Sequence, residues 1–400
     1  MKWRAALLAL LGAAAVAAVA IAFTARGGDE LPFGHHLLVG TADDALRQSD
    51  PAAALALAKI SRDAGFDAVL VSSMWTRAAS TPSAAELATL GNVVNAADEE
   101  GLELFVFVWH GLSGNTPRTA TARRRFAAYA AAIARAYPAI RHFVVGNEPN
   151  LNTFWLPQFG PGGRDVAADG YLDLLARTYD ALKAVSPRIK VIGGALAPRG
   201  SDRPRGKRET HSPTRFIEDL GAAYRASGRT KPLMDAIALH PYMRTSALSP
   251  TESHATSTTI TIADYSKLTT LLGRAFSGTA QRGRRLPIYY TEFGVQTRVP
   301  PAERHAYTNL KSAAAVDAVD PRTQARYYRQ ALSLAACQPN VRGFFIFHTF
   351  DEPDLNGWQS GLYYADQRPK PSLQPFRSGA SAARAARLVR CAGERFVREE

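Results

Sequence analysis

Short apolar runs alternate with longer amphipathic segments along most of the chain. Eight runs have the length and composition of buried strands, and each is followed by a segment in which apolar residues recur at helical spacing. The predicted strands span residues 36–40, 67–73, 102–110, 142–148, 189–196, 236–243, 286–293 and 343–350. The predicted helices span residues 51–64, 84–100, 120–136, 170–185, 212–226, 263–276, 321–336 and 372–390. This alternation predicts a parallel sheet with crossover helices.

Polar and aromatic side chains gather at the C-terminal ends of the predicted strands. They are Thr41, Asp43, Ser73, Trp75, Trp109, His110, Asn147, Glu148, His240, Tyr242, Glu292, His348 and Asp351. In a closed barrel these ends converge on one mouth. An open, doubly wound sheet instead has its site at one switch point, usually with a glycine-rich phosphate loop after the first strand, and the sequence has none there. We therefore predict an α/β fold, a single-domain (β/α)8 TIM barrel.

The first residues of the chain have the pattern of an export signal. Lys2 and Arg4 precede an uncharged stretch over residues 5–23, which as a helix of roughly 28 Å is long enough to cross a bilayer core. Residues 18–20 also have the small side chains of a signal-peptidase site. The positive-inside rule places the rest of the chain outside the cytoplasm, either membrane-anchored or secreted.

This pattern predicts a hydrophobic N-terminal helix ahead of the barrel. The expected organisation is a signal peptide or membrane anchor over residues 1–27, a linker over 28–34, the barrel over 35–392 and a C-terminal tail over 393–400.

Two glutamates end apolar strands. Glu148 closes the run 142–148 and Glu292 lies near the end of the run 286–293, the fourth and seventh predicted strands. An ionised carboxylate at the end of a buried strand is costly unless it has a task or a partner. Because a proline restricts the residue before it, we expect Pro149 to hold Glu148 in an extended backbone conformation.

Two carboxyl groups that face each other in a mouth lined with aromatic side chains can cleave a glycosidic bond. One protonates the leaving oxygen and the other attacks the anomeric carbon. Burial and mutual repulsion are expected to raise the pKa of one group, which becomes the acid, while hydrogen bonds keep the other ionised.

With these residues the chain resembles the clan A glycoside hydrolases, which include cellulase-like, mannanase-like and β-xylosidase-like retaining enzymes. The resemblance spans roughly residues 35–375 and rests on the Asn147–Glu148 pair after strand four and Glu292 on strand seven. It implies that Glu148 is the acid/base, that Glu292 is the nucleophile and that Asn147 holds the sugar 2-hydroxyl.

The resemblance also implies roles for side chains around the two glutamates. His240 and Tyr242 follow strand six, and Tyr242 is expected to orient the nucleophile; His110, after strand three, matches a subsite histidine. Clan members commonly carry an arginine after strand two, where this chain has serines at 72–73, and a tryptophan after strand eight, where residues 347–350 read Phe-His-Thr-Phe. These departures leave the family within the clan open.

Other side chains at strand ends are candidates for contacts with a sugar. Trp75, Trp109, Trp358 and His348 are predicted to contribute to substrate binding. Stacking on a sugar face and packing in the core are both open for each tryptophan, and a buried structural role is the alternative for the histidines His110 and His240.

The net charge of +13 raises the question of a polyanionic partner. Most arginines are spread along predicted helices, where a solvated face is the ordinary explanation, so we predict no nucleic-acid partner. Only residues 199–208 form a dense basic loop, which favours at most an acidic substrate or a charged envelope surface.

The sequence contains two cysteines, Cys337 and Cys391. Both follow the ends of neighbouring outer helices in the predicted barrel, so they either form a disulfide at its bottom face or remain two buried thiols. The histidines are scattered, and no zinc, dinucleotide or phosphate-loop motif occurs, so neither a metal nor a cofactor is predicted.

Together these patterns predict a retaining β-glycosidase that acts on an oligo- or polysaccharide, with its two carboxyl groups about 5–5.5 Å apart. Two alternatives stay open. One is a surface-anchored, carbohydrate-binding barrel without turnover, in which long loops occlude the mouth or arginines form salt bridges with both glutamates. The other is a transglycosylase, which shares every named residue and excludes water from the glycosyl-enzyme.

Overall fold

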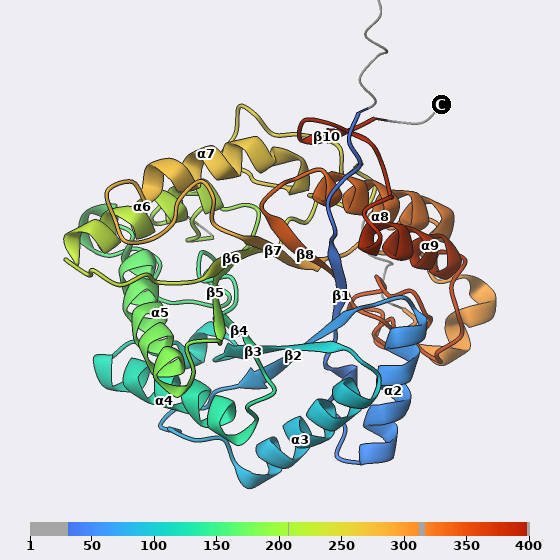
Figure 1. Cartoon of the computed structure of the whole chain (residues 1–400), viewed down its shortest axis with the longest axis horizontal. Helices are drawn as coiled ribbons and strands as arrows, with labels where there is room; N and C mark the ends of the chain where they lie inside the picture. The colour runs from blue at the N-terminus through green and yellow to red at the C-terminus, as the bar shows by residue number, and fades with distance from the viewer. Residues whose placement is uncertain (1–30, 207, 312–316, 398–400) are drawn as a thin grey trace, which may run out of the picture. The chain divides into compact units, whose positions relative to one another are not determined.

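A closed barrel of eight parallel strands forms the centre of the structure (Figure 1). The computed structural model of the chain describes residues 31–206, 208–311 and 317–397. The strands are β1 (Leu38–Ala42), β2 (Ala68–Met74), β3 (Glu103–Trp109), β4 (His142–Val145), β5 (Lys190–Leu196), β6 (Ala236–Leu239), β7 (Ile288–Phe293) and β8 (Val341–Phe347). Each pairs in parallel with its neighbours, and β8 closes onto β1. The barrel predicted from the sequence is confirmed.

One α-helix follows each strand and packs on the outside of the barrel. The helices are α2 (Pro51–Asp63), α3 (Ala84–Glu99), α4 (Ala120–Ala136), α5 (Val166–Val185), α6 (Pro213–Ala226), α7 (Tyr265–Ala275), α8 (Pro321–Ala336) and α9 (Leu373–Arg384). Short polar side chains begin several of them: Ser83, Thr119 and Asp165 each accept a hydrogen bond from a backbone N–H in the first turn. Proline occupies the first position of α2, α6 and α8, where no N–H is needed.

Side chains fill the interior of the barrel. Along each strand they alternate with side chains that point outward and pack against the helices. Phe105 and Phe345 meet in the interior at 5.0 Å between ring centroids. They fit because β1 carries Gly40, where an added Cβ would lie 2.4 Å from the ring of Phe345. The barrel is therefore a packed core rather than a channel, and only its C-terminal end is free for a site.

The end of the chain differs from the sequence prediction. Helix α9 stops at Arg384, earlier than expected, and β10 (Arg395–Phe396), within the predicted tail, pairs with β9 (Cys391–Ala392). Cys337, at the end of α8, and Cys391 form a disulfide, with their Cα atoms 5.5 Å apart.

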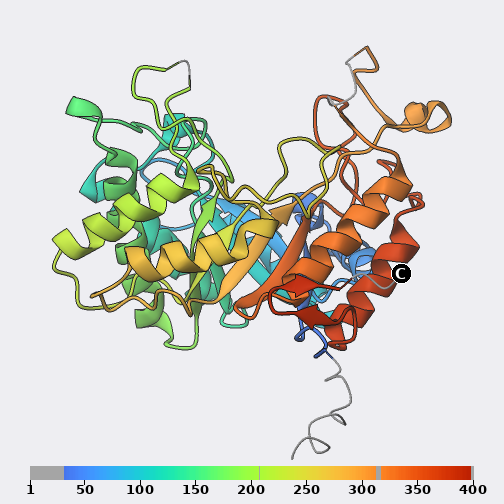
Figure 2. The ribbon, with the colours of Figure 1, turned by 90° about the horizontal axis from the view of Figure 1, so that it is seen from above.

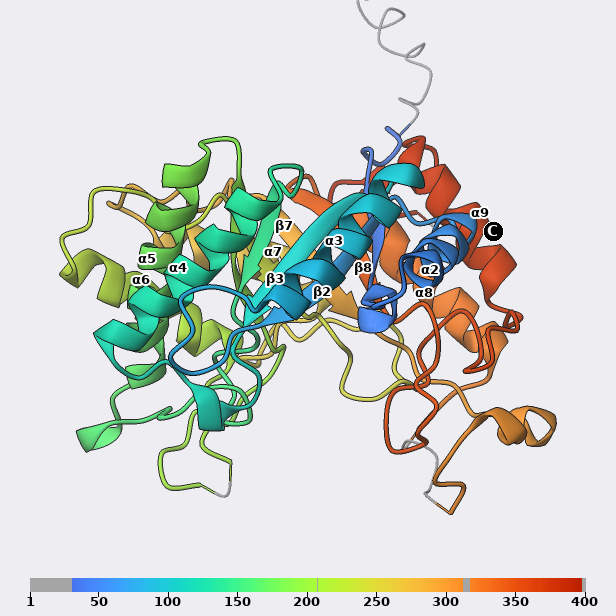
Figure 3. The same ribbon diagram turned by 90° about the horizontal axis from the view of Figure 1, so that it is seen from below.

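Long loops after the later strands all extend from one side of the barrel, which is upward in Figure 2 and downward in Figure 3. They include residues 197–206 and 208–212 after β5, 240–261 after β6, 294–311 and 317–320 after β7, and 348–372 after β8. The predicted helix over residues 1–27 lies outside the described residues. Within the part of the chain that the structure describes, no helix is both long and apolar enough to span a membrane.

Candidate active site

A cavity of about 930 Å³ opens at the C-terminal end of the barrel. Seven of the side chains proposed from the sequence line it: Trp109, Asn147, Glu148, Tyr242, Glu292, His348 and Trp358. They come from the ends of β3, β4, β6, β7 and β8, or from the loops that follow. The residues that the sequence pattern assigned to separate strands therefore meet in one pocket.

Glu148 is held by an unusual turn after β4. The strand ends at Val145, Gly146 has a φ of 77° and Glu148 has a φ of 37°, in the left-handed region. The expectation that Pro149 keeps Glu148 extended is therefore wrong. The Glu148 N–H donates to Ala195 O at 2.9 Å, and this bond to β5 fixes the turn. A left-handed conformation costs a non-glycine residue about 1–3 kcal/mol and recurs at functional sites.

Glu292 lies on β7 and is held through Tyr242. The Tyr242 hydroxyl donates to Glu292 Oε2 at 3.1 Å. Burial raises the pKa of Tyr242 well above its ordinary value, so its proton stays in place to donate. The ring is fixed by aromatic neighbours, with Trp358 at 5.2 Å and Phe293 at 6.4 Å between centroids.

The side chain of His240 contacts both carboxylates. Its Nδ1 is 3.1 Å from Glu148 Oε1 and 3.5 Å from Glu292 Oε2, so these two oxygens are at most about 6.6 Å apart, the sum of the two distances. Burial lowers the pKa of His240, but the charge of Glu292 and the hydrogen bond to Glu148 outweigh it, and the net pKa is raised. A protonated imidazole between the glutamates offsets their mutual repulsion.

The pKa pattern differs in one respect from the sequence expectation. Burial raises the pKa of Glu292, the group assigned as nucleophile, and the nearby charge of Glu148 adds to this. His240 and the Tyr242 hydroxyl oppose the increase. The contacts with His240 and the Tyr242 hydroxyl, together with the charge of His348, therefore favour the ionised form of Glu292 against the effect of burial.

Aromatic side chains form part of the pocket lining. Trp109 stands at the end of β3 and has Phe154 at 6.1 Å, edge to face. Trp358 comes from the loop after β8, and Phe347 lies 5.5 Å from it. Flat apolar rings beside polar groups are suited to stacking on the faces of sugar rings.

Three residues proposed for substrate binding do not line the cavity, and two of them lie away from the reacting groups. Trp75 is fully buried, donates its indole N–H to Ala79 O and packs against Phe126, so its proposed sugar contact is wrong. His110 is 1% exposed and packs against Trp155, and burial lowers its pKa to about 4. It is a neutral core histidine rather than a pocket contact. His240 is the third, but it reaches the site by touching both glutamates.

Some lining residues were missed by the sequence reasoning. Arg199, Arg208 and Arg244 line the cavity, and the dense basic run was the signal for the first two. Asp44 also lines the cavity, and its carboxylate accepts hydrogen bonds from the backbone N–H of Ser72 at 2.6 Å and from the Ser72 hydroxyl. Ser72 stands near the end of β2, at the position where clan members commonly have an arginine. Nothing in the local sequence identified Asp44 or Arg244, because their places depend on how two loops fold over the mouth.

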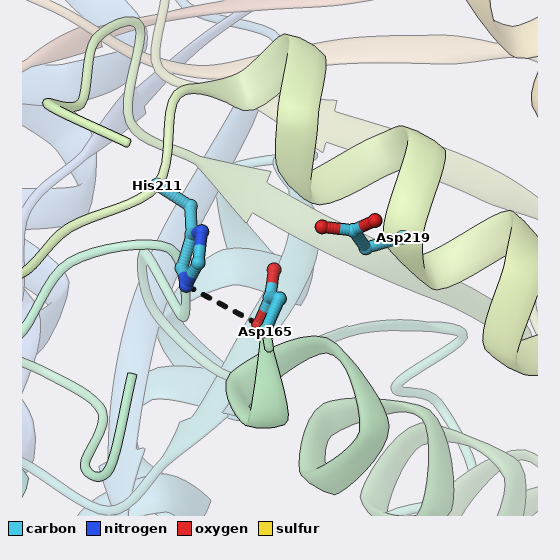
Figure 4. A group of neighbouring side chains, drawn as sticks. All are labelled: Asp165, His211 and Asp219. Carbon is cyan, nitrogen blue, oxygen red and sulfur yellow. Dashed lines mark ion pairs between the residues drawn. The ribbon is translucent and has the colours of Figure 1, made fainter. Parts of the chain in front are cut away.

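Asp165, His211 and Asp219 form a second polar cluster, outside the cavity lining (Figure 4). One donor atom from each lies within 4.8 Å of the others, and an imidazole with two carboxylates is a donor set that zinc accepts. His211 Nε2 is 3.3 Å from Asp165 Oδ1, which caps α5, and Asp219 is paired with Arg215 at 2.7 Å. Burial raises the pKa of Asp165 to about 7. The cluster ties the loops after β4 and β5 together.

Comparison with known proteins gives a likeness in fold. No protein-family model matches the chain, and neither does any curated sequence. Among solved structures, GH5_18 from Streptomyces cattleya in complex with GlcNAc has 18% identity and a TM-score of 0.55, covering 88% of this chain and 81% of that one. A glucosidase from Croceicoccus marinus has 13% identity and a TM-score of 0.57, covering 89% and 69%. A monomeric β-xylosidase from Caulobacter crescentus has 16% identity and a TM-score of 0.54, covering 87% and 69%. The chain thus shares the (β/α)8 fold of glycoside hydrolases, as the sequence resemblance implied.

Proposed function

We propose that this protein is a retaining glycoside hydrolase that cleaves β-glycosidic bonds by double displacement. The observation that carries the proposal is a pair of carboxylates, Glu148 and Glu292, joined by His240 at the base of an open, partly aromatic cavity. Its fold neighbours include a glucosidase and a β-xylosidase, and one binds GlcNAc, which supports a saccharide substrate.

The distance between the carboxylates supports retention. Retaining enzymes hold the two groups about 5–5.5 Å apart, and inverting enzymes hold them about 6.5–9.5 Å apart to leave room for water. The two oxygens that face His240 are separated by at most about 6.6 Å, the sum of 3.1 and 3.5 Å. This bound applies to the two nearer oxygens, and it supports the closer spacing of retaining enzymes over the wide end of the inverting range.

The roles follow from how each glutamate is held. Glu292 accepts a hydrogen bond from Tyr242 and faces His240, and both contacts favour its ionised form, as a nucleophile needs. Glu148 protonates the leaving oxygen in the first step and activates water in the second. The buried Oδ1 of Asn147 has no hydrogen-bond partner among the described residues, which suits a contact with the sugar 2-hydroxyl.

The binding-only alternative is disfavoured by the same geometry. Within the described residues, Glu148 contacts His240, Glu292 contacts both His240 and Tyr242, and no arginine forms a salt bridge with either glutamate. The mouth holds a cavity of about 930 Å³ and is not occluded.

We also propose that the barrel works outside the cytoplasm, anchored or released through residues 1–27. The Cys337–Cys391 disulfide supports this, because disulfides persist mainly in oxidising compartments. Fractionation of cells that express the tagged chain tests it, and recovery of the barrel in the cytoplasmic fraction would contradict it.

The test of the activity is release of chromophore from a panel of aryl β-glycosides. Glu292→Gln is expected to lose glycosyl-enzyme formation, whereas Glu148→Gln should retain the first step with activated leaving groups. Glu218→Gln, on the outer helix α6, is the matched control and should keep full activity. Equal loss in both site variants on every substrate would contradict the roles, and transfer of the sugar to an added acceptor without hydrolysis would indicate a transglycosylase.

A further inference from the structure

The cavity wall formed by the loops after β5 and β6 is unusually basic. Arg199, Arg208 and Arg244 line it, whereas the lining carboxylates lie on the β1, β4 and β7 sides. Positive charge is thus concentrated on one side of the pocket, beside the reacting pair.

None of these three arginines has a carboxylate partner among the described residues. Arg199 is partly buried, whereas Arg208 and Arg244 are exposed. Other partly buried arginines of the barrel are paired: Arg229 contacts Asp180 at 2.7 Å and Arg123 contacts Asp173 at 3.2 Å. Arg199 Nη1 donates a hydrogen bond to a backbone carbonyl, Tyr242 O, at 3.0 Å. Because a partly buried charge is costly without an ion-pair partner, the guanidinium of Arg199 indicates a partner that arrives with the ligand, and the exposed Arg208 and Arg244 add positive charge on the same wall.

Arg199 lies beside the two glutamates proposed as the reacting pair. Its anchor is the backbone of Tyr242, whose hydroxyl holds Glu292, and its charge interacts with Glu148. One Nη1 bond leaves most of the five guanidinium N–H donors for a ligand. Burial lowers the pKa of Arg199 and the charge of Arg244 adds to this, while the charge of Glu148 opposes it. An anion between the two arginines would act in the same direction as Glu148 and offset their mutual repulsion.

We infer that the pocket binds a saccharide that carries an oxyanion, a carboxylate or a sulfate, on a sugar ring beside the cleaved bond. Arginine recognises both groups through paired N–H donors, and it does so better than a lysine point charge. The inference rests on the proposed function for its catalytic part, but the binding part stands on the arginines alone.

The experiment separates binding from turnover. Binding is measured by calorimetry on the Glu292→Gln protein, with methyl β-glycosides that differ only at C6: hydroxymethyl, carboxylate or O-sulfate. Turnover is measured on the unaltered protein with the corresponding aryl glycosides. We expect an anionic sugar to bind and react better than its neutral counterpart by roughly tenfold to a hundredfold, and the arm that responds identifies the oxyanion.

Variants in the loops then test the arginines. Arg199→Gln and Arg244→Gln are expected to reduce the anionic-to-neutral ratio of kcat/KM, and of affinity, by roughly tenfold or more. Arg203→Gln, in the loop after β5 but outside the cavity lining, removes the same charge and should leave the ratio unchanged.

The outcomes keep the two hypotheses apart. Arginine-dependent binding of an anionic sugar without turnover of any glycoside would support the subsite and contradict the proposed hydrolase. Turnover of neutral glycosides with no advantage for either anion would overturn the subsite and leave the hydrolase intact. Equal losses on neutral and anionic substrates in the arginine variants would also overturn the subsite, because the arginines would then act only on Glu148.

Discussion

Removal of a single hydroxyl should reveal how Glu292 is kept ionised. In Tyr242→Phe the ring remains in its aromatic surroundings, but the hydrogen bond of 3.1 Å to Glu292 Oε2 is lost. That bond lowers the pKa of Glu292 against the effect of burial. Its loss must therefore raise the pKa of Glu292 and move the acid limb of the kcat/KM profile to higher pH.

The size of the effect follows from the strength of the bond. A hydrogen bond to a charged group contributes about 1.5–3 kcal/mol, and 1.36 kcal/mol corresponds to a tenfold change. Below the acid limb, kcat/KM should fall by roughly ten- to 150-fold. On the plateau at higher pH, where Glu292 is ionised in both proteins, the loss should be much smaller.

The assay is the pH dependence of kcat/KM for an aryl glycoside with an activated leaving group. Tyr224→Phe is a suitable control, because it removes a tyrosine hydrogen bond of 2.7 Å, to Lys231 O, at a site remote from the cavity. A uniform loss across the pH range, or an acid limb that moves to lower pH, would refute the idea that the Tyr242 hydroxyl maintains the charge of Glu292.

Three further predictions concern stability. The pKa of Asp165 is raised to about 7 in the folded protein, so the stability that Asp165 contributes is fully present below its unfolded pKa near 4 and is lost as pH rises through 7. Between pH 5 and 8 the melting temperature of Asp165→Asn should therefore fall less than that of the unaltered protein. Parallel plots of melting temperature against pH would contradict this. Reduction of the Cys337–Cys391 disulfide, which closes a loop with a sequence separation of 54, should lower the unfolding free energy in urea by up to about 4 kcal/mol, without altering activity at the opposite end of the barrel. Lys370→Met leaves the buried Asp351 without its ion-pair partner at 2.6 Å and should lower the unfolding free energy in the same urea assay by about 3–5 kcal/mol. A decrease of less than about 1 kcal/mol would count against a tight ion pair in the folded protein.

The sequence predicted the barrel well because its signals are local. Each strand is a short apolar run and each helix has its own periodicity, so eight units could be recognised without knowledge of their contacts. The strand-end positions of Glu148 and Glu292 carried the same information, since the C-terminal ends of barrel strands must converge.

What the sequence could not predict depends on contacts between distant segments. Glu148 departs from the extended conformation because its N–H bonds to Ala195 on β5, which outweighs the local preference before a proline. Trp75 also follows a strand, yet its ring turns outward against Phe126 on α4. Arg244 enters the pocket only because the loop after β6 folds over the mouth, and loop paths are not encoded by periodicity.

The most direct test of the central claim is to trap the glycosyl-enzyme. The protein is incubated with the activated 2-deoxy-2-fluoro derivative of whichever aryl glycoside it hydrolyses, digested, and analysed by mass spectrometry. The account predicts the added mass of one glycosyl unit on the peptide that contains Glu292, and none in Glu292→Gln. A label on another residue, or none on a protein that still turns over the parent glycoside, would contradict double displacement through Glu292.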